Sequence, residues 1–207
     1  MGFVLYWRPG AASLAPHAAL AEIGVDYRLV EIGREEAQTS ADYRALNPLG
    51  VVPTLVDEEH GLVLTESAAI LLYLGDRFPD ARLAPDERAE YYRWLIFLTN
   101  TVQTSMLRFF YPERYGAEDS VGAAAARDAG DAFDILDRAL EGKTWLAAGH
   151  RTGADLFLFM LTRWGRRLDP PSWDRPNLRR HFLSTLELPG VRRMLDEQNL
   201  DLPEWAE

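Results

Sequence analysis

In the first third of the chain, short apolar runs flank one amphipathic stretch, a pattern typical of mixed α/β structure. An aromatic and β-branched run at residues 3–7 predicts a strand, and apolar and polar residues alternate at 27–32 as in a second strand. Between them, apolar residues at helical spacing follow Ser13, the expected N-cap, and end at Gly24. A strand, helix and strand of this length favour a parallel pair with a right-handed crossover.

The following segments complete one folding unit. A short helix is expected at residues 41–46. Residues 54–57 and 62–65 are separated by a turn-forming stretch that ends in Gly61, and they predict a β-hairpin. A helix is then expected from Ser67 to about residue 78, after which strand patterns end.

The rest of the chain carries apolar residues at helical spacing. Thr152-Gly153-Ala154-Asp155 resembles a capping box placed before a nearly all-apolar helix, which belongs in a core. Together these patterns predict an α/β domain over residues 1–79, a linker at 80–85 and an all-helical domain over 86–207. The expected helices of the second domain are 86–110, which is long and bent, then 120–140, 156–164, 178–185 and 191–199.

Composition narrows the functional classes. The 207 residues are 47% hydrophobic, enough for a core, and the net charge of −10 argues against a nucleic-acid-binding surface. The absence of cysteine excludes disulfides and a catalytic thiol supplied by the protein. No signal peptide and no membrane-spanning apolar run is found, so a cytoplasmic location without a membrane partner is expected.

Two neighbouring motifs predict a binding site for a small peptide. Proline cannot donate to a β-ladder, so the backbone of Val52 in front of Pro53 is expected to be open to an extended ligand. Thr65-Glu66-Ser67 opens a helix, and the first N–H groups of a helix attract a carboxylate. Glu66 could hold an ammonium group. The competing interpretation is an ordinary strand junction followed by an ordinary helix cap.

Small residues and a hydroxyl mark the start of the first helix, a candidate reaction centre. The positive end of the helix dipole there would stabilise a bound thiolate. Ser13 is the first candidate donor and Tyr6 the second, although capping and sheet packing are their common roles. The four histidines stand far apart at no metal-ligand spacing, so we expect no metal and interpret them as surface or capping residues: His17, His60, His150 and His181.

With these motifs in order, the chain resembles the cytosolic glutathione S-transferases, nearest the bacterial beta class. The resemblance covers nearly the whole chain and is carried by residues 9–17, 47–53, 65–67 and 152–155. It implies a thioredoxin-like first domain in which the backbone of Val52 pairs with the cysteinyl part of glutathione and Pro53 is cis. It also implies that Glu66 and Ser67 hold the γ-glutamyl end, with Arg34 a weaker candidate for the glycine carboxylate.

The chain departs from the beta class in two places. Relatives commonly carry cysteine where this chain has Ala12, so activation of glutathione is left to a hydrogen bond and the helix dipole. Gln103 and Thr104 stand where relatives often carry histidine and lysine. By resemblance, the second substrate would be lined by Gln103, Leu107, Phe110, Tyr111 and Trp164, for which a role in the helical core is the competing interpretation. Thr152 and Asp155 would cap a helix without a catalytic role.

The expected function is conjugation of glutathione, the co-substrate, to a small hydrophobic electrophile. Glutathione-dependent isomerisation, peroxide reduction or dehalogenation stays open as an alternative, because the distinguishing groups lie in variable helices. A glutathione-binding or protein-interaction module without useful catalysis is the second alternative, and Ala12 favours it. The resemblance also implies a homodimer.

Overall fold

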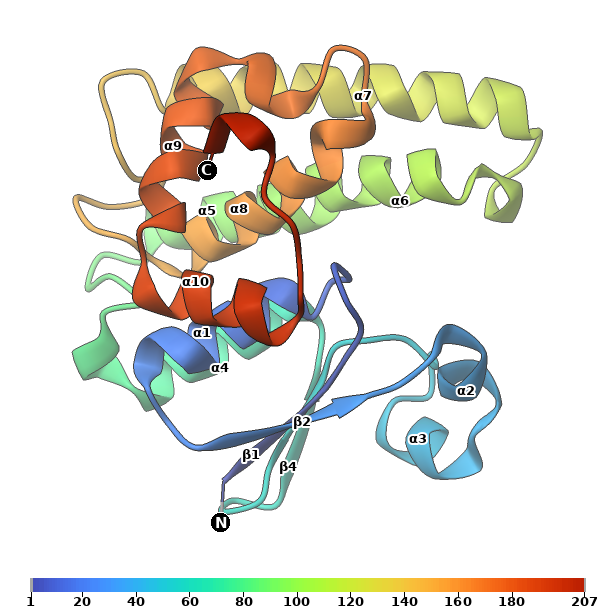
Figure 1. The fold of residues 1–207 in the computed structure, drawn as a ribbon, viewed down its shortest axis with the longest axis vertical. Coiled ribbons are helices and arrows are strands. Elements are labelled where there is room, and N and C mark those ends of the chain that lie inside the picture. Colours follow the sequence, from blue (N-terminus) through green and yellow to red (C-terminus); the bar gives the residue numbers. More distant parts are fainter. Residues whose placement is uncertain (1, 207) are drawn as a thin grey trace. The chain divides into compact units, whose positions relative to one another are not determined.

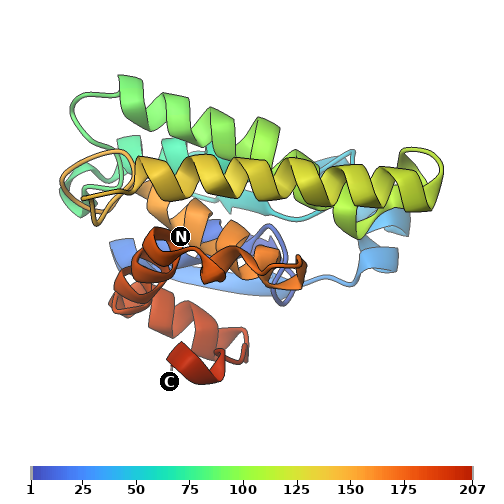
Figure 2. The same cartoon turned by 90° about the horizontal axis from the view of Figure 1, so that it is seen from above.

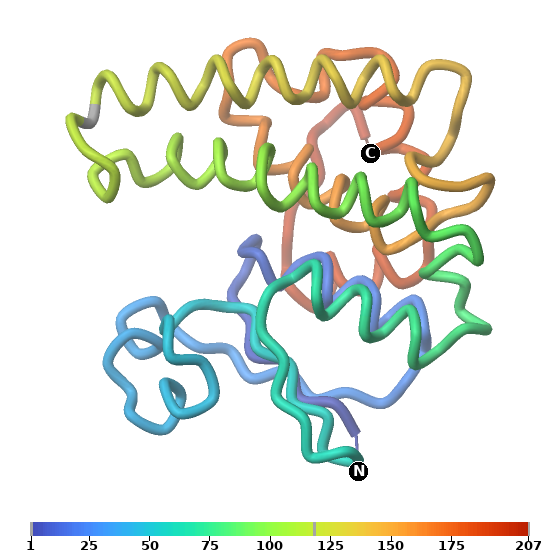
Figure 3. Tube along the Cα trace, turned by 180° about the vertical axis from the view of Figure 1, so that it is seen from behind, coloured from blue at the N-terminus to red at the C-terminus, as the bar shows by residue number. Residues whose placement is uncertain are grey.

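The computed structural model describes residues 2–206, apart from the side chain of Glu118. The chain forms two compact units, of which the first combines Met1–Leu83 with Leu186–Glu207 and the second is Ala84–Thr185. The sequence-based division assigned all of 86–207 to one domain, whereas packing groups the last of these residues with the first unit. Figure 3 traces the path of the chain.

A four-stranded mixed sheet forms the centre of the first unit. Strand β1 (Phe3–Trp7) pairs in parallel with β2 (Tyr27–Glu31), as predicted, and antiparallel with β3 (Thr54–Asp57). Strand β4 (Leu62–Thr65) closes the predicted hairpin, which gives the order β2-β1-β3-β4. The buried positions of β1 and β3, including Leu5 and Leu55, face the core.

Helices cover this sheet. Helices α1 (Leu14–Ile23) and α4 (Ser67–Arg77) pack against each other, and α10 (Pro189–Glu197) packs on α1 (Figure 1). Two short helices, α2 (Arg34–Thr39) and α3 (Ala41–Leu46), link β2 to β3. Only α3 was expected. The polar composition of α2, in which Ala37 alone is buried, gave no helical periodicity.

The second unit is helical, as predicted. Helix α5 (Ala89–Phe97) runs through a π-helical turn (Leu98–Gln103) into α6 (Thr104–Phe110), so the helix expected over residues 86–110 is interrupted by an irregular turn. Helix α7 (Glu118–Ala139) lies along α6 (Figure 2). Helix α8 (Gly153–Trp164) is buried along its whole length. Helix α9 (Pro176–Leu186) follows it and is buried on one side only. In the part of the chain that is described, no helix is both long and apolar enough to cross a membrane.

Asp155 holds the start of the buried helix α8. Its Oδ2 accepts hydrogen bonds from the backbone N–H of Thr152 at 2.7 Å and from the Thr152 hydroxyl at 2.9 Å. Its Oδ1 accepts from the N–H of Leu146 at 2.8 Å and from His181 Nε2 at 3.0 Å. The capping box is therefore present, and its carboxylate also binds two segments outside the helix.

Candidate functional site

The loop that carries Val52 is fixed by a buried polar network. The Tyr43 hydroxyl donates to the carbonyl oxygen of Val51 at 2.6 Å, and Asn47 Nδ2 donates to the same oxygen at 2.7 Å. Both side chains also reach the Thr54 hydroxyl, at 2.9 Å and 3.2 Å. These bonds occupy the carbonyl before Val52 and the side chain at the start of β3, so they set the position of the two residues between them.

Val52 presents its backbone at the end of the sheet. Its side chain is buried with Ile32, Ala37 and Tyr43, and the Val52-Pro53 peptide bond is cis, as the resemblance implies. The ladder between β1 and β3 starts only at Thr54, and no other described residue bonds to the N–H or C=O of Val52. An extended peptide can therefore pair with both groups.

Glu66 and Ser67 lie at the junction of β4 and α4. Glu66 has φ 65°, a left-handed conformation that costs energy for a residue with a side chain. Among the described residues no side chain caps α4, so its first N–H groups are available to a carboxylate. The Ser67 hydroxyl donates instead to the carbonyl oxygen of Ala12 at 2.9 Å, which joins the start of α4 to the start of α1.

Ser13 is placed differently from the expectation. Its side chain is fully buried, its hydroxyl accepts from the N–H of Arg8 and donates to the C=O of Arg8, each at 3.3 Å, and it makes no capping bond. Its φ of −69° and ψ of −11° are helical, whereas an N-cap residue is extended. Ser13 thus occupies the predicted N-cap position of α1, but its hydroxyl closes the turn before the helix and does not cap it.

Tyr6 and Arg34 are more accessible than Ser13. The Tyr6 ring packs on Tyr43, with ring centroids 5.2 Å apart, and it is only partly buried beside the cluster that contains Val52. Its hydroxyl bonds to none of the described residues. Arg34 begins α2 on the exposed side of the unit. The first unit thus brings Tyr6 and Val52 together, and Ser67 with Ala12.

The residues predicted for the second substrate share one region of the second unit. Leu107 and Phe110 lie on α6, and Gln103 and Tyr111 directly precede and follow this helix; all four residues are partly buried. The Trp164 ring at the end of α8 lies 5.8 Å from that of Phe110, in edge-to-face geometry. Gln103 is the last residue of the π-helical turn, so its orientation depends on that irregularity.

Comparison with known proteins identifies the family. One family model, the N-terminal domain of glutathione S-transferase, matches residues 1–76, and a second, the C-terminal domain, matches residues 97–189. The chain belongs to the glutathione S-transferase family. A glutathione S-transferase of Xanthomonas campestris is 35% identical over 171 residues, which cover 79% of this chain and 82% of that protein. One of Escherichia coli is 34% identical over 169 residues, covering 77% and 81%.

Solved structures of glutathione S-transferases share the fold. The enzyme from Xylella fastidiosa superposes with a TM-score of 0.87 at 30% identity, and the beta-class enzyme from Sphingomonas chungbukensis with 0.85 at 33%. A sphingomonad glutathione S-transferase solved in complex with glutathione has a TM-score of 0.84 at 32% identity. Each of these comparisons covers 96% of this chain and 100% of the other.

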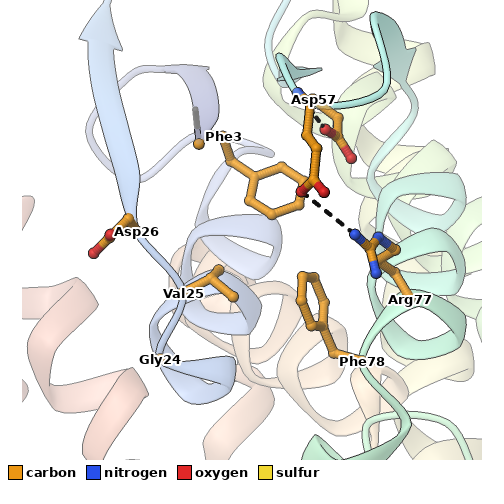
Figure 4. A pocket seen from close by; sticks show the side chains of 9 residues that line it. Phe3, Gly24, Val25, Asp26, Asp57, Arg77 and Phe78 are labelled. Atoms are coloured by element: carbon orange, nitrogen blue, oxygen red, sulfur yellow. Dashed lines mark hydrogen bonds and ion pairs between the residues drawn. The ribbon is translucent and has the colours of Figure 1, made fainter.

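In this member of the family, a cavity of about 340 Å³ lies at the opposite end of the sheet from Val52. Phe3, Arg77 and Phe78 line it (Figure 4). Glu59 also lines it and forms an ion pair with Arg77 at 3.4 Å. None of the residues predicted to bind glutathione lines it. Among the described residues, no three histidine or carboxylate side chains come close enough together to hold a metal ion.

The transferase also contains a buried polar cluster that the sequence did not reveal. His17 and His181 are almost fully buried, which contradicts their interpretation as surface or capping residues. His17 Nε2 lies 2.7 Å from Oε2 of Glu197, and His17 Nδ1 lies 3.0 Å from Nε2 of Gln198. Oε1 of Gln198 accepts from the N–H of Gly10 at 3.1 Å. The C-terminal segment thereby contacts the loop before Ala12.

Electrostatics of this cluster favour a neutral histidine. Burial lowers the pKa of His17 below its ordinary value, against the opposing effect of Glu197. Burial acts to raise the pKa of the Glu197 carboxyl, but hydrogen bonds from Tyr27, Arg193 and His17 outweigh it, so this pKa lies below its ordinary value. Neutral His17 therefore donates from Nε2 to the Glu197 carboxylate and accepts from Gln198 at Nδ1.

Proposed function

We propose that this glutathione S-transferase conjugates the glutathione thiolate to a small hydrophobic electrophile. The observation that carries the proposal is the direct bond from the Ser67 hydroxyl to the carbonyl of Ala12, because it holds two helix N-termini side by side. Two such termini suit a tripeptide that has a carboxylate at one end and a developing thiolate in the middle.

Glutathione is assigned to the first unit. Val52 pairs through its backbone with the cysteinyl part, beside Pro53, and the N–H groups at the start of α4 receive the γ-glutamyl carboxylate. Glu66 receives the ammonium, and Arg34 the glycine carboxylate. Ser67 contributes its backbone N–H, since its hydroxyl is already bonded to Ala12.

The thiolate is assigned to the start of α1. The backbone N–H groups of Ala12 and Ser13 bond to no other described residue, and they carry the positive end of the helix dipole. Tyr6, partly exposed and with an uncommitted hydroxyl, ranks before the buried Ser13 as a side-chain donor, which reverses the order expected from the sequence. Lowering the thiol pKa by one unit requires about 1.4 kcal/mol, within reach of these groups.

Two measurements test these assignments. Calorimetry of glutathione binding should show an affinity about tenfold lower for Glu66→Gln, because a charge-assisted bond to the ammonium is lost. Glu141→Gln, which changes an exposed carboxylate of the second unit, is the matched control. Unchanged affinity in Glu66→Gln would remove Glu66 from the site.

The second measurement is the pKa of bound glutathione, followed through thiolate absorbance. Tyr6→Phe should raise the pKa of the bound thiol. Ser13→Ala should destabilise the fold and leave this pKa unchanged. If Ser13→Ala alone raises the thiol pKa, the ranking is wrong. Binding without turnover across a panel of electrophiles and peroxides would favour the non-catalytic module, and glutathione recovered after turnover would favour isomerisation.

Homodimerisation and a cytoplasmic location complete the proposal. Tyr92 and Ile96, one turn apart on α5, leave 46% and 53% of their surface exposed, which suits a partner surface on the second unit. Light scattering at micromolar concentration should report twice the chain mass. A monomer at that concentration would contradict the proposed dimer and leave the proposed conjugation reaction unaffected.

A further inference from the structure

Two arginines lie over neighbouring aromatic rings of the second unit. The Phe110 ring lies 6.3 Å from that of Tyr111 and 5.8 Å from that of Trp164. Arg167 holds its Cζ 5.4 Å from the centre of the Phe110 ring, and Arg114 holds its Cζ 4.3 Å from the centre of the Tyr111 ring. These five residues are called the arginine–aromatic surface below.

The positive charge of this surface is poorly compensated. Arg167 and the neighbouring Arg166 form no ion pair with any described carboxylate. Among the described carboxylates Arg114 pairs with Glu113 alone, at 3.9 Å between two half-exposed side chains, and such pairs contribute little. By contrast, Arg175 of the same unit bonds to Asp134 at 2.5 Å. In a chain of net charge −10, a cationic patch whose one described acidic partner is the exposed Glu113 is a local exception.

Helix capping explains one of these arginines and leaves the other two unexplained. Arg166 Nη1 donates to the carbonyl of Arg163 at 3.0 Å, which stabilises the end of α8. Burial, and then repulsion from Arg167, lower the pKa of Arg166 below its ordinary value. Arg167 and Arg114 instead lie over rings, with guanidinium groups suited to binding an oxyanion.

We propose that the arginine–aromatic surface selects electrophiles in which a flat apolar body carries a carboxylate or sulfonate, with Arg167 as the residue that determines this preference. The rings contact the body and Arg167 pairs with the anion, with Arg114 as a second cation on the same surface. This inference rests on the proposed conjugation, for which it names the class of second substrate.

A matched pair of substrates tests the inference. A chlorodinitrobenzoate and its methyl ester share one ring and differ in charge. In each reaction the glutathione sulfur bonds to the ring carbon, the carbon–chlorine bond breaks, chloride leaves with the electron pair and the thiol proton passes to solvent. Because the ester is intrinsically more reactive, each kcat/KM is divided by the rate constant of the uncatalysed reaction with glutathione.

We expect the wild type to prefer the carboxylate on this normalised scale. Arg167→Ala should lower kcat/KM for the carboxylate about tenfold, mainly through KM, and change it for the ester by less than about twofold. Arg167→Lys should recover part of the preference. Arg127→Ala, an exposed arginine of α7, is the control and should change neither value.

Calorimetry supplies a second measurement that needs no turnover. Dinitrobenzoate without the leaving group should bind more tightly than dinitrobenzene, and Arg167→Ala should abolish the difference. The inference would be overturned if Arg167→Ala lowered kcat/KM equally for the carboxylate and the ester, or if it changed only the KM for glutathione. A wild type that conjugates the ester without preferring the carboxylate also overturns it and leaves the proposed function intact. A wild type that conjugates neither compound contradicts the proposed function. In that case the calorimetric comparison alone tests whether Arg167 favours the carboxylate.

Discussion

Gln198 and Gly10 are joined by a hydrogen bond of 3.1 Å although 188 positions separate them in the sequence. The donor is the backbone N–H of Gly10, two residues before Ala12, and the acceptor is the side-chain oxygen of Gln198, just after α10. Because Gln198 also donates to His17 in α1, the C-terminal segment holds both the loop and the helix that form the assigned thiolate site. Gln198 is 3% exposed and His17 is fully buried, so the bond between them is shielded from water.

Replacing Gln198 by leucine should therefore affect stability and catalysis together. Nδ1 of the buried His17 would lose the hydrogen bond from Gln198, and the N–H of Gly10 would lose its bond to the Gln198 side chain, at a combined cost of roughly 2 kcal/mol of unfolding free energy. A looser loop should also lower kcat, with a smaller effect on KM for glutathione. Guanidinium unfolding and steady-state kinetics check both, with the exposed Gln38→Leu as control. If the variant had the unfolding free energy of the wild type, the two hydrogen bonds of Gln198 would make no net contribution to stability.

His17 gives stability a defined pH dependence. Its pKa is lower in the folded protein than in the unfolded chain, where it is about 6.5. The unfolded state consequently takes up a proton first as pH falls, so stability is complete above about pH 6.5 and declines from there toward the folded pKa. As pH is lowered through this range, the urea midpoint of unfolding should fall in the wild type and change less in His17→Gln.

Gly50 should resist substitution. It has φ +63°, and a Cβ atom there would lie 2.7 Å from the carbonyl oxygen of Ala37, which is backbone and cannot move aside. Gly50→Ala should lower thermal stability and weaken glutathione binding, because the shifted loop carries Val52. Gly61→Ala is the control, since its φ is also +63° but open space surrounds it. Similar losses in both variants would assign the effect to φ alone.

Asp155→Asn should cost about 3 kcal/mol or more of unfolding free energy in the second unit. The carboxylate accepts four hydrogen bonds, and an amide with one oxygen leaves donors among Leu146, Thr152 and His181 unpaired. Denaturant unfolding measures the loss, with the exposed Asp128→Asn of α7 as control. Bound glutathione should keep its thiol pKa, which separates this structural role from catalysis.

The parts of the fold that follow from local pattern could be predicted from the sequence. The alternation of apolar and polar residues along β2 predicted a strand parallel to β1, and the turn before Leu62 predicted the hairpin of β3 and β4. Both predictions needed only the pattern of neighbouring residues. The short helix α2 could not be found in this way, since it buries Ala37 and little else. The grouping of 186–206 with the first unit depends on contacts between distant segments, which no local pattern records.

The candidate site divides in the same way. The proline after Val52 and the motif around Glu66 are visible in the sequence because proline and helix starts have local signatures. Ser13 is also visible, but the orientation of its hydroxyl depends on how the turn at Arg8 closes. His17 stands alone in the sequence, and its partner Gln198 comes from the far end of the chain, so only the folded structure shows that it is buried and bonded.

The first unit is built from both ends of the chain, with α10 packed on α1. During synthesis, residues 186–206 leave the ribosome only after the whole second unit has been made. Until then Gly10 and His17 lack Gln198, so the first unit cannot complete the hydrogen bonds that hold the assigned thiolate site. A fragment ending at Leu83 would retain the four described strands of the sheet and still lack Gln198, so the support of the assigned thiolate site comes from a segment made after the second unit.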